Sequence, residues 1–330
     1  MKLFRFARRA CALLLGAGLG VGTAVAQVPP AYPDRPVKVI VPYAPGGMTD
    51  VSSRAVMDRL GRELGQPVVV ENKAGAASTL ASNWVARQPA DGYTLYAAPV
   101  SLVINPILQG GVQYDPRKDF EPISLMIVSP FVLQVNPGLG VRNMQELLAL
   151  VRSHPDKYAI GTSGAGSVNH LAAEYFLRAF KLKAAVVHYR GGAPAAQDLM
   201  GGTIQMMFSA ANEAAPLMQQ GRTVGIAVST TRRLPLLPEV PTLEEASGLR
   251  DFDAVFWMAL MVPAGTPAPV VGRLRDAMQK IGGDTELRNR MARLGVEFLT
   301  STPAEVQQRM DRDEARWGRL IRELGIKETS

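Results

Sequence analysis

Cysteine is almost absent from this chain of 330 residues. The one cysteine, Cys11, lies in an N-terminal stretch with the features of a removable leader. The rest of the chain can therefore form no disulfide bond and can supply no thiolate nucleophile. A chain of this length without disulfides must be stabilised by its own hydrophobic core, and about 300 residues most naturally form two domains.

Histidine is also scarce, and the common metal and nucleotide motifs are missing. The chain has three histidines, and it contains neither a His-Glu-x-x-His pair nor a Gly-x-x-x-x-Gly-Lys loop. Lys and Arg number 36 against 29 Asp and Glu, but part of this excess lies in the leader, and no basic tract or aromatic platform indicates nucleic-acid binding. We therefore expect no metal, no cofactor and no nucleic-acid partner.

Residues 1–26 have the pattern of a secretory signal peptide. Lys2, Arg5, Arg8 and Arg9 precede an apolar segment over residues 10–21, and Ala24-Val25-Ala26 fits the small-x-small rule for cleavage after Ala26. The apolar segment is short for a membrane span of about 20 residues, and an uncleaved anchor is the alternative. We expect export by the general secretory route, although Arg8-Arg9 is a feature of the twin-arginine route.

Strand-like and helix-like segments alternate along the remaining chain. This alternation predicts an α/β fold with a parallel or mixed sheet covered by helices, in which ligands bind at the carboxyl ends of strands. The expected extended segments are residues 37–41, 68–70, 93–97, 120–135, 158–160, 184–188, 204–208, 224–228 and 252–262. The expected helices are residues 49–64, 77–87, 143–153, 169–180, 194–200, 211–220, 269–281, 285–294 and 303–324.

A glycine- and serine-rich loop over Gly161–Ser167 joins an expected strand to an expected helix. Glycine permits backbone conformations that turn several N–H groups inward, and Ser and Thr add hydroxyl donors. The start of the helix contributes further N–H groups and a partial positive charge. The loop is therefore a candidate seat for an anion that needs no cation, and a glycine-rich helix cap with nothing bound is the alternative.

A second junction of the same type follows the strand at Val37–Val41. Its loop, Tyr43–Asp50, contains Gly46-Gly47, and Thr49 or Asp50 is expected to cap the next helix. Neither loop contains a cation, and the nearest ones are Arg54 and Arg190. We therefore expect Ser167 and Thr162 to matter more for affinity than any Lys or Arg.

Many spaced motifs resemble the Bug-type solute receptors, the periplasmic binding subunits associated with tripartite tricarboxylate transporters. The resemblance covers essentially the whole chain after the leader, in order. The motifs are Tyr32–Pro36, Val39–Gly47 with Asp50, Val70–Ala76, Ala90–Leu95, Asn105-Pro106, Tyr114–Pro116, Asp119-Phe120, Ser163–Ser167 with His170-Leu171, Tyr189–Ala195, Asp198–Gly202, Leu237–Thr242 and Pro263–Pro267.

The resemblance implies a type II periplasmic-binding-protein fold, with two α/β domains around a central ligand cleft. Residues 27–127 and 249–330 would form the first domain and residues 128–248 the second, with crossings at Phe120–Pro130 and Asp251–Met258 and closure on ligand binding. It also implies a periplasmic monomer without enzymatic activity. Such a protein would capture a di- or tricarboxylate, an acidic amino acid or a related organic acid for membrane transporter subunits or a sensory partner.

The expected ligand-binding residues come from the two junctions and from neighbouring loops. They are Tyr43, Ala44, Gly46, Gly47, Thr49, Asp50, Ser78, Ser101, Thr162, Ser163, Gly164, Gly166, Ser167, His170, Tyr189, Gly191, Ala193 and Ser209. For Asp50 a capping role is the alternative, and His170 could also orient the Gly-Ser loop. The family commonly continues Gly-Ala with two further glycines, where this chain has Ala77-Ser78. This departure narrows the freedom of the backbone there.

A secreted serine hydrolase that uses Ser163 is the alternative function. The nucleophile elbow requires Gly-x-Ser-x-Gly, and Ala165 stands where the last glycine should be. The base would have to be His154, His170 or His188. We expect no catalytic residue in this chain.

Overall fold

The structure is a computed structural model that describes residues 32–326 apart from residues 47, 110, 190 and 251, with the backbone alone for Met48 and Leu324. The expected leader lies outside these residues. The strands are β1 (Val37–Val41), β2 (Val68–Asn72), β3 (Thr94–Pro99), β4 (Phe120–Val135), β5 (Ala159–Thr162), β6 (Ala185–His188), β7 (Met206–Ala210), β8 (Val224–Val228) and β9 (Val255–Pro263). The α/β alternation expected from the sequence is confirmed.

The helices cover both faces of the sheet. They are α1 (Met48–Leu64), α2 (Thr79–Val85), α3 (Ser101–Leu108), α4 (Met144–Ser153), α5 (Val168–Ala179), α6 (Gly192–Gly201), α7 (Ala211–Gln219), α8 (Leu243–Ser247), α9 (Ala268–Gly282), α10 (Thr285–Arg293) and α11 (Pro303–Leu324), with short 3₁₀ turns η1 (Ala76–Ser78) and η2 (Pro137–Leu139). The helices α3 and α8 were not expected, since α3 contains Pro106 within an almost wholly apolar run and α8 is five residues long.

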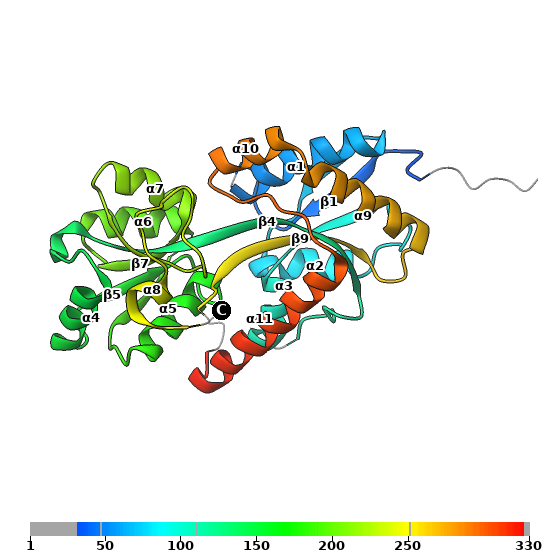
Figure 1. Ribbon diagram of the computed structural model, residues 1–330. Coiled ribbons are helices and arrows are strands. Elements are labelled where there is room, and N and C mark those ends of the chain that lie inside the picture. The colour runs from blue at the N-terminus through cyan, green and yellow to red at the C-terminus, as the bar shows by residue number, and fades with distance from the viewer. Residues whose placement is uncertain (1–31, 47, 110, 190, 251, 327–330) are drawn as a thin grey trace, which may run out of the picture. The chain divides into compact units, whose positions relative to one another are not determined.

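Two long antiparallel strands join two groups of parallel strands (Figure 1). In the first group, β1 pairs in parallel with β2 and β3. The strand β9 lies between β3 and β4 and is antiparallel to both. In the second group, β5 pairs in parallel with β6 and β7. The last residues of β4 pair with β7 and β8, so β4 takes part in both groups.

The strand β9 is buried on both faces, because helices pack on each side of it. Trp257, Ala259 and Met261 belong to the apolar cluster that includes residues of α3, α5 and α11. The intervening Met258 and Leu260 belong to the cluster that includes residues of α1, α9 and α10. A continuous apolar sequence is what such a doubly covered strand requires.

The C-terminal helix α11 is fixed to β9 by a buried carboxylate. A capping box of Thr302 and Glu305 begins the helix. Asp313, 3% exposed, accepts a hydrogen bond of 2.5 Å from Trp257 Nε1 and one of 3.2 Å from Arg309 Nε. Burial raises the pKa of Asp313, and the charge of Arg309 and the Trp257 hydrogen bond oppose that shift.

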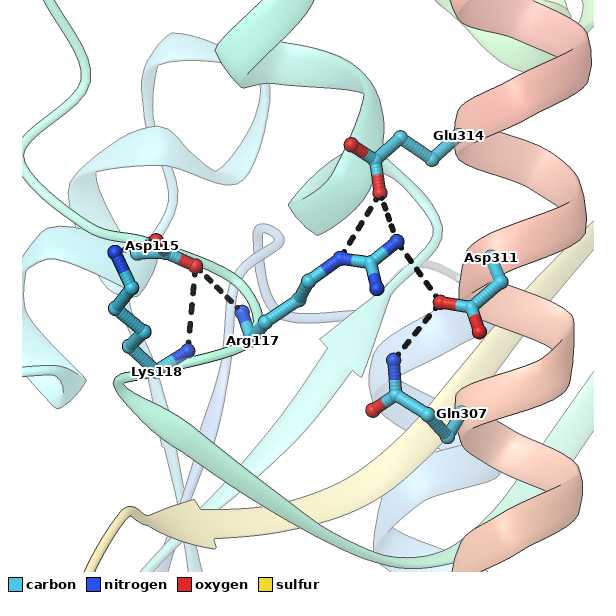
Figure 2. Close-up of polar contacts among 6 residues, drawn as sticks. All are labelled: Asp115, Arg117, Lys118, Gln307, Asp311 and Glu314. Atoms are coloured by element: carbon cyan, nitrogen blue, oxygen red, sulfur yellow. Dashed lines mark hydrogen bonds and ion pairs between the residues drawn. The ribbon is translucent and has the colours of Figure 1, made fainter.

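Surface ion pairs connect α11 to the loop before β4 and to α5. Figure 2 shows Arg117, from the loop before β4, 2.9 Å from Asp311 and 2.6 Å from Glu314. Further along, Glu323 of α11 lies 2.7 Å from Arg178 of α5. Such exposed pairs each contribute little stability, so they indicate where α11 lies rather than what holds it.

Candidate functional site

Both glycine-rich loops lie where the sequence predicts, each between a strand and a helix. The first follows β1 and runs into α1, and the second follows β5 and runs into α5. The helix α1 already begins at Met48, so Thr49 and Asp50 lie inside its first turn. The prediction that one of them caps this helix is therefore wrong, and Gly47 lies outside the described residues.

Asp50 organises the first loop from within the helix. Its side chain is buried, and Oδ2 accepts a hydrogen bond of 2.9 Å from the Gly46 N–H. Arg54 contacts the same carboxylate, with Nε 3.1 Å from Oδ2. Asn72, at the end of β2, donates to Asp50 Oδ1 at 2.8 Å and to the Tyr43 carbonyl at 2.9 Å. One carboxylate thus joins the loop, the helix and the neighbouring strand.

The Asp50 carboxylate stays charged despite its burial. Burial by itself would raise the pKa of Asp50, but the hydrogen bonds from Arg54, Gly46 and Asn72 outweigh this effect and bring the pKa below its ordinary value. Because Arg54 is engaged with Asp50, the cation that follows the first loop in the sequence already has a partner within the protein.

A cluster of neutral hydroxyl groups lies beside the first loop. Ser78 Oγ is 2.7 Å from Ser101 Oγ at the start of α3. Tyr43 lies next to Ser101, and burial raises the pKa of Tyr43 far above its ordinary value although the Ser101 hydrogen bond lowers it somewhat. The ring of Tyr43 also meets that of Phe256 edge to face, with centroids 6.0 Å apart. The structure therefore brings Tyr43, Ser78 and Ser101 together, as a shared site requires.

The turn at Ala76–Ser78, where the resemblance leads us to expect further glycines, adopts a backbone that favours glycine. Ala76, Ala77 and Ser78 have φ values of 45°, 48° and 80°, all in the left-handed region. Asn105 Nδ2 donates to the Ala77 carbonyl at 2.8 Å, and Ser82 Oγ donates to the Ser78 carbonyl at 3.1 Å. Side chains of two helices thus hold a turn that is strained for residues with a Cβ.

Asn169 organises the second loop, and the sequence analysis did not single it out. It is 4% exposed, and its Oδ1 lies 2.8 Å from Ser163 Oγ and 2.6 Å from Ser167 Oγ. Its Nδ2 donates to the Phe208 carbonyl of β7 at 3.1 Å. The one signal in the sequence is its position, two residues after a serine that caps the helix.

His170 holds the same loop through its ring. The Gly166 N–H donates to His170 Nδ1 at 3.0 Å, and His170 Nε2 lies 3.6 Å from Glu174 Oε1. The ring of His188 meets that of His170 edge to face, with centroids 4.5 Å apart. Thr162, which is fully buried, has its Oγ1 2.8 Å from His188 Nδ1. Partial burial lowers the pKa of His188, His170 lowers it further, and Glu174 opposes the shift.

Most N–H groups of the second loop already have acceptors within the protein. Asn169 Oδ1 accepts from the Ser163 N–H, and the Gly164 carbonyl accepts from the Ser167 N–H. The Gly166 N–H points to His170. No acceptor among the described residues serves the N–H groups of Ala165, Val168 and Asn169. An anion at this loop would therefore meet the start of α5 rather than the whole run of glycines.

The remaining predicted site residues divide between the second loop and other contacts. Gly191 donates its N–H to the Ser163 carbonyl at 3.1 Å and so lies against this loop. Tyr189 donates its hydroxyl to Asp198 at 2.7 Å. Ser209 is 1% exposed, and its hydroxyl has no partner among the described residues. Ala44 and Ala193 are exposed, and Arg190 lies outside the described residues.

The second loop also touches α3, the helix that carries Ser101 at its other end. A Cβ added to Gly166 would lie 2.9 Å from Leu108 Cδ1. The two sets of predicted residues are thus linked by one helix of eight residues. Surface cavities of about 550 and 520 Å³ elsewhere are lined by none of the predicted site residues.

The proposed hydrolase nucleophile does not face a base. Ser163 Oγ donates to Asn169 rather than to a histidine. Within the described ranges, no group of three or more His, Cys, Asp or Glu side chains is arranged to hold a metal ion. In that same part of the chain, no helix has both the length and the apolar character to cross a membrane.

Known proteins with similar sequences match nearly the whole chain. The model of the tripartite tricarboxylate transporter family receptor matches residues 52–326. A UPF0065 protein from the tcbD-tcbE intergenic region of Pseudomonas sp. strain P51 is 32% identical over 316 residues, which cover 95% of this chain and 94% of that protein. Protein BugT of Bordetella pertussis is 31% identical over 320 residues, which cover 96% of this chain and 98% of BugT.

Solved structures agree with these sequence matches. The periplasmic binding protein BugD is 32% identical, with a TM-score of 0.77 over 90% of this chain and 100% of BugD. An R. palustris protein solved with adipate is 30% identical, with a TM-score of 0.79 over 90% of this chain and 99% of that protein. MatC of Rhodopseudomonas palustris, solved with bound malate, is 31% identical, with a TM-score of 0.75 over 88% of this chain and 100% of MatC.

Proposed function

Because this chain belongs to the tripartite tricarboxylate transporter receptor family, we propose that it captures a small carboxylate in the periplasm and delivers it to a membrane transporter. Its fold is the two-domain α/β fold of periplasmic binding proteins. One observation carries the proposal. Two of the similar proteins described above were solved with a dicarboxylate, adipate in one and malate in the other.

The domain division supports a ligand site between the two glycine-rich loops. We assign residues 27–127 and 249–330 to one domain and residues 128–248 to the other, with β4 and β9 as the crossings. Pairing of β4 with β9 up to Pro130, and with β7 from Phe131 onward, supports a boundary in the middle of β4. Cleft residues of both domains must meet one small ligand, so closure about these crossings accompanies binding.

The contacts of the two loops support recognition of a carboxylate by neutral donors. Tyr43, Ser78 and Ser101 offer hydroxyl groups in one domain, and the first turn of α5 offers N–H groups in the other. Arg54 is committed to Asp50, so the ligand would rely on N–H and hydroxyl groups. Each hydrogen bond to a charged group contributes on the order of 1.5–3 kcal/mol. A monomer with one such site is sufficient for the proposed role.

The test is calorimetric titration with a panel of dicarboxylates, tricarboxylates, acidic amino acids and aromatic acids. We expect at least one of these acids to bind and affinity to depend weakly on salt. Ser167→Ala should weaken binding about tenfold or more, because the Ser167 hydroxyl holds Gly164 and Asn169 in place at the start of α5, and about 1.4 kcal/mol is a factor of ten. Asn143→Ala is the matched control, because Asn143 caps α4 as Ser167 caps α5 but lies outside the proposed site.

The Asn143→Ala control separates an effect on ligand affinity from an effect on the stability of the fold. Both variants should lose stability by about 1 kcal/mol, whereas Ser167→Ala alone should lose affinity. If no acid on the panel bound, and an esterase activity disappeared in Ser163→Ala, the protein would be a hydrolase and the proposal would be wrong.

A further inference from the structure

The contact between Gly166 and His170 specifies the protonation state of the histidine. A backbone N–H can only donate, so His170 Nδ1, 3.0 Å away, must present a lone pair. In a neutral imidazole the single proton is then on Nε2. That atom lies 3.6 Å from Glu174 Oε1, an acceptor placed one helical turn further along α5. The second loop is therefore held by a neutral ring of one tautomer.

Few charged or titratable side chains lie near the ring among the described residues. His170 is 4% exposed, so water cannot readily replace the Gly166 contact. Glu174 faces Nε2 from the same helix, and His188 of β6 meets the ring edge to face at 4.5 Å. Where α11 packs on α5, Arg178 and Glu323 pair with each other about two turns beyond His170.

A second proton on the ring would turn Nδ1 from an acceptor into a donor. The Gly166 N–H and the new Nδ1–H would then point at each other. The hydrogen bond from Gly166 to His170, which we call the tether, would be lost. Gly166 has a φ of 76° and lies against Leu108, so the loop depends on its local contacts to keep this shape.

We propose that His170 is a positioning residue whose unprotonated Nδ1 holds the Gly164–Ser167 loop in its binding shape, so that ligand affinity falls as the solution becomes acidic. The inference rests on the proposed function only for its effect on affinity. The tether itself, and its loss on protonation, are properties of the protein without ligand.

The binding experiment uses the most tightly bound acid of the panel, at about pH 7.5 and about pH 5.5, because histidine changes its charge between these values. Wild type should lose about tenfold in affinity, equivalent to about 1.4 kcal/mol. The acid also gains protons in this range, so the quantity that matters is the difference between wild type and a variant that cannot titrate at position 170.

His170→Asn is that variant, because its Oδ1 can accept from Gly166 near the position of Nδ1 and does not titrate. At pH 7.5, His170→Asn should bind the acid almost as tightly as wild type, whereas His170→Ala should bind it more weakly. Between pH 7.5 and pH 5.5, the affinity of wild type should fall about tenfold more than that of His170→Asn. His154→Gln removes an exposed histidine at the end of α4 and should behave as wild type. His188→Gln should retain the pH dependence.

Nuclear magnetic resonance tests the tether without any ligand. The chain has three histidines, so their ring nitrogens can be assigned with His→Gln variants. At neutral pH, Nδ1 of His170 should be unprotonated, and the Gly166 amide shift should follow the titration of that ring. A proton on Nδ1 at neutral pH, or a Gly166 amide that ignores the titration, would overturn the inference.

The two experiments fail in different ways. If no acid binds at either pH, the proposed function fails, and the Gly166 amide still decides whether the tether exists. If acids bind and the pH dependence is equal in wild type and His170→Asn, the proposed function stands and His170 does not control affinity.

Discussion

The two glycine-rich loops are held by the same pattern of hydrogen bonding, but the accepting side chain is a carboxylate in one and an imidazole in the other. In each, a left-handed glycine donates its N–H to a side chain four residues later, inside the first turn of the next helix. Gly46 donates to Asp50 at 2.9 Å, and Gly166 donates to His170 at 3.0 Å. The φ values of the glycines are also close, 83° and 76°. The backbone geometry therefore requires an acceptor at this spacing but does not require a charge.

The difference lies in how each acceptor responds to protons. Hydrogen bonds from Arg54, Gly46 and Asn72 keep the pKa of Asp50 below its ordinary value. The stabilisation from Asp50 is therefore fully present above the unfolded-state pKa of about 3.9, and it is lost only as the pH falls through the lower folded-state value. His170 is an acceptor only while its ring is neutral. The first loop is thus held by Asp50 at every pH that the protein is expected to meet. The second loop is held by His170 only while that ring is neutral.

The largest expected effect is that of Asp50→Ala, which leaves Arg54, Asn72 and the Gly46 N–H without their common acceptor. The free energy of unfolding should fall by about 3 kcal/mol in urea denaturation. Asp58→Ala is the control, because Asp58 lies on the same helix in an exposed pair with Arg62 and should cost less than about 1 kcal/mol. Equal losses would show that Asp50 does not organise the first loop.

Measuring the free energy of unfolding at two pH values tests the same difference between Asp50 and His170. The loss in Asp50→Ala should be the same at about pH 7.5 and about pH 5.5, since Asp50 is ionised at both. The loss in His170→Ala should be smaller at the lower pH, because a ring that gains a proton no longer accepts from the Gly166 N–H.

The glycines themselves provide a second, smaller test. Gly46→Ala should cost about 1 kcal/mol for the left-handed backbone alone, because no atom lies within 4 Å of the added Cβ. Gly166→Ala should cost about 1 kcal/mol more, since its Cβ would lie 2.9 Å from Leu108 Cδ1. In a Leu108→Ala background this excess should disappear. An excess that persists would mean that Leu108 does not restrict the second loop.

The smallest expected effect is a gain in stability at the turn beside the first loop. Ala77 has φ 48° and ψ 41°, so Ala77→Gly should relieve strain and stabilise the fold by about 0.5 kcal/mol, after the entropy cost of glycine. Ala86, with φ −55°, has the right-handed backbone that suits alanine, and Ala86→Gly should lower the melting temperature instead. Lower stability in both variants would contradict this account of the turn.

Local sequence patterns predict the scaffold better than the site. Runs such as Val37–Val41 and Val224–Val228 have the lengths of the observed strands, because most of their residues are apolar and the majority are buried. The glycines predict where the two loops lie, but they do not predict which atoms the polar groups of the loops contact. Ser163 and Ser167 lie on Asn169, and Asn72 joins Asp50 to Tyr43. Those partnerships depend on where a neighbouring strand or helical turn ends in space, which a local pattern does not contain.

The position of β9 also constrains the order in which the protein can be assembled. This strand separates β3 from β4 in the sheet although it follows β4 by more than a hundred residues in the chain. Until Val255–Pro263 has been synthesised, β3 and β4 each lack a neighbour on the edge that β9 later fills. Pairings over such long separations form slowly. An emerging chain therefore stays incompletely folded until β9 has been made, which is the state that the export proposed for this protein would require.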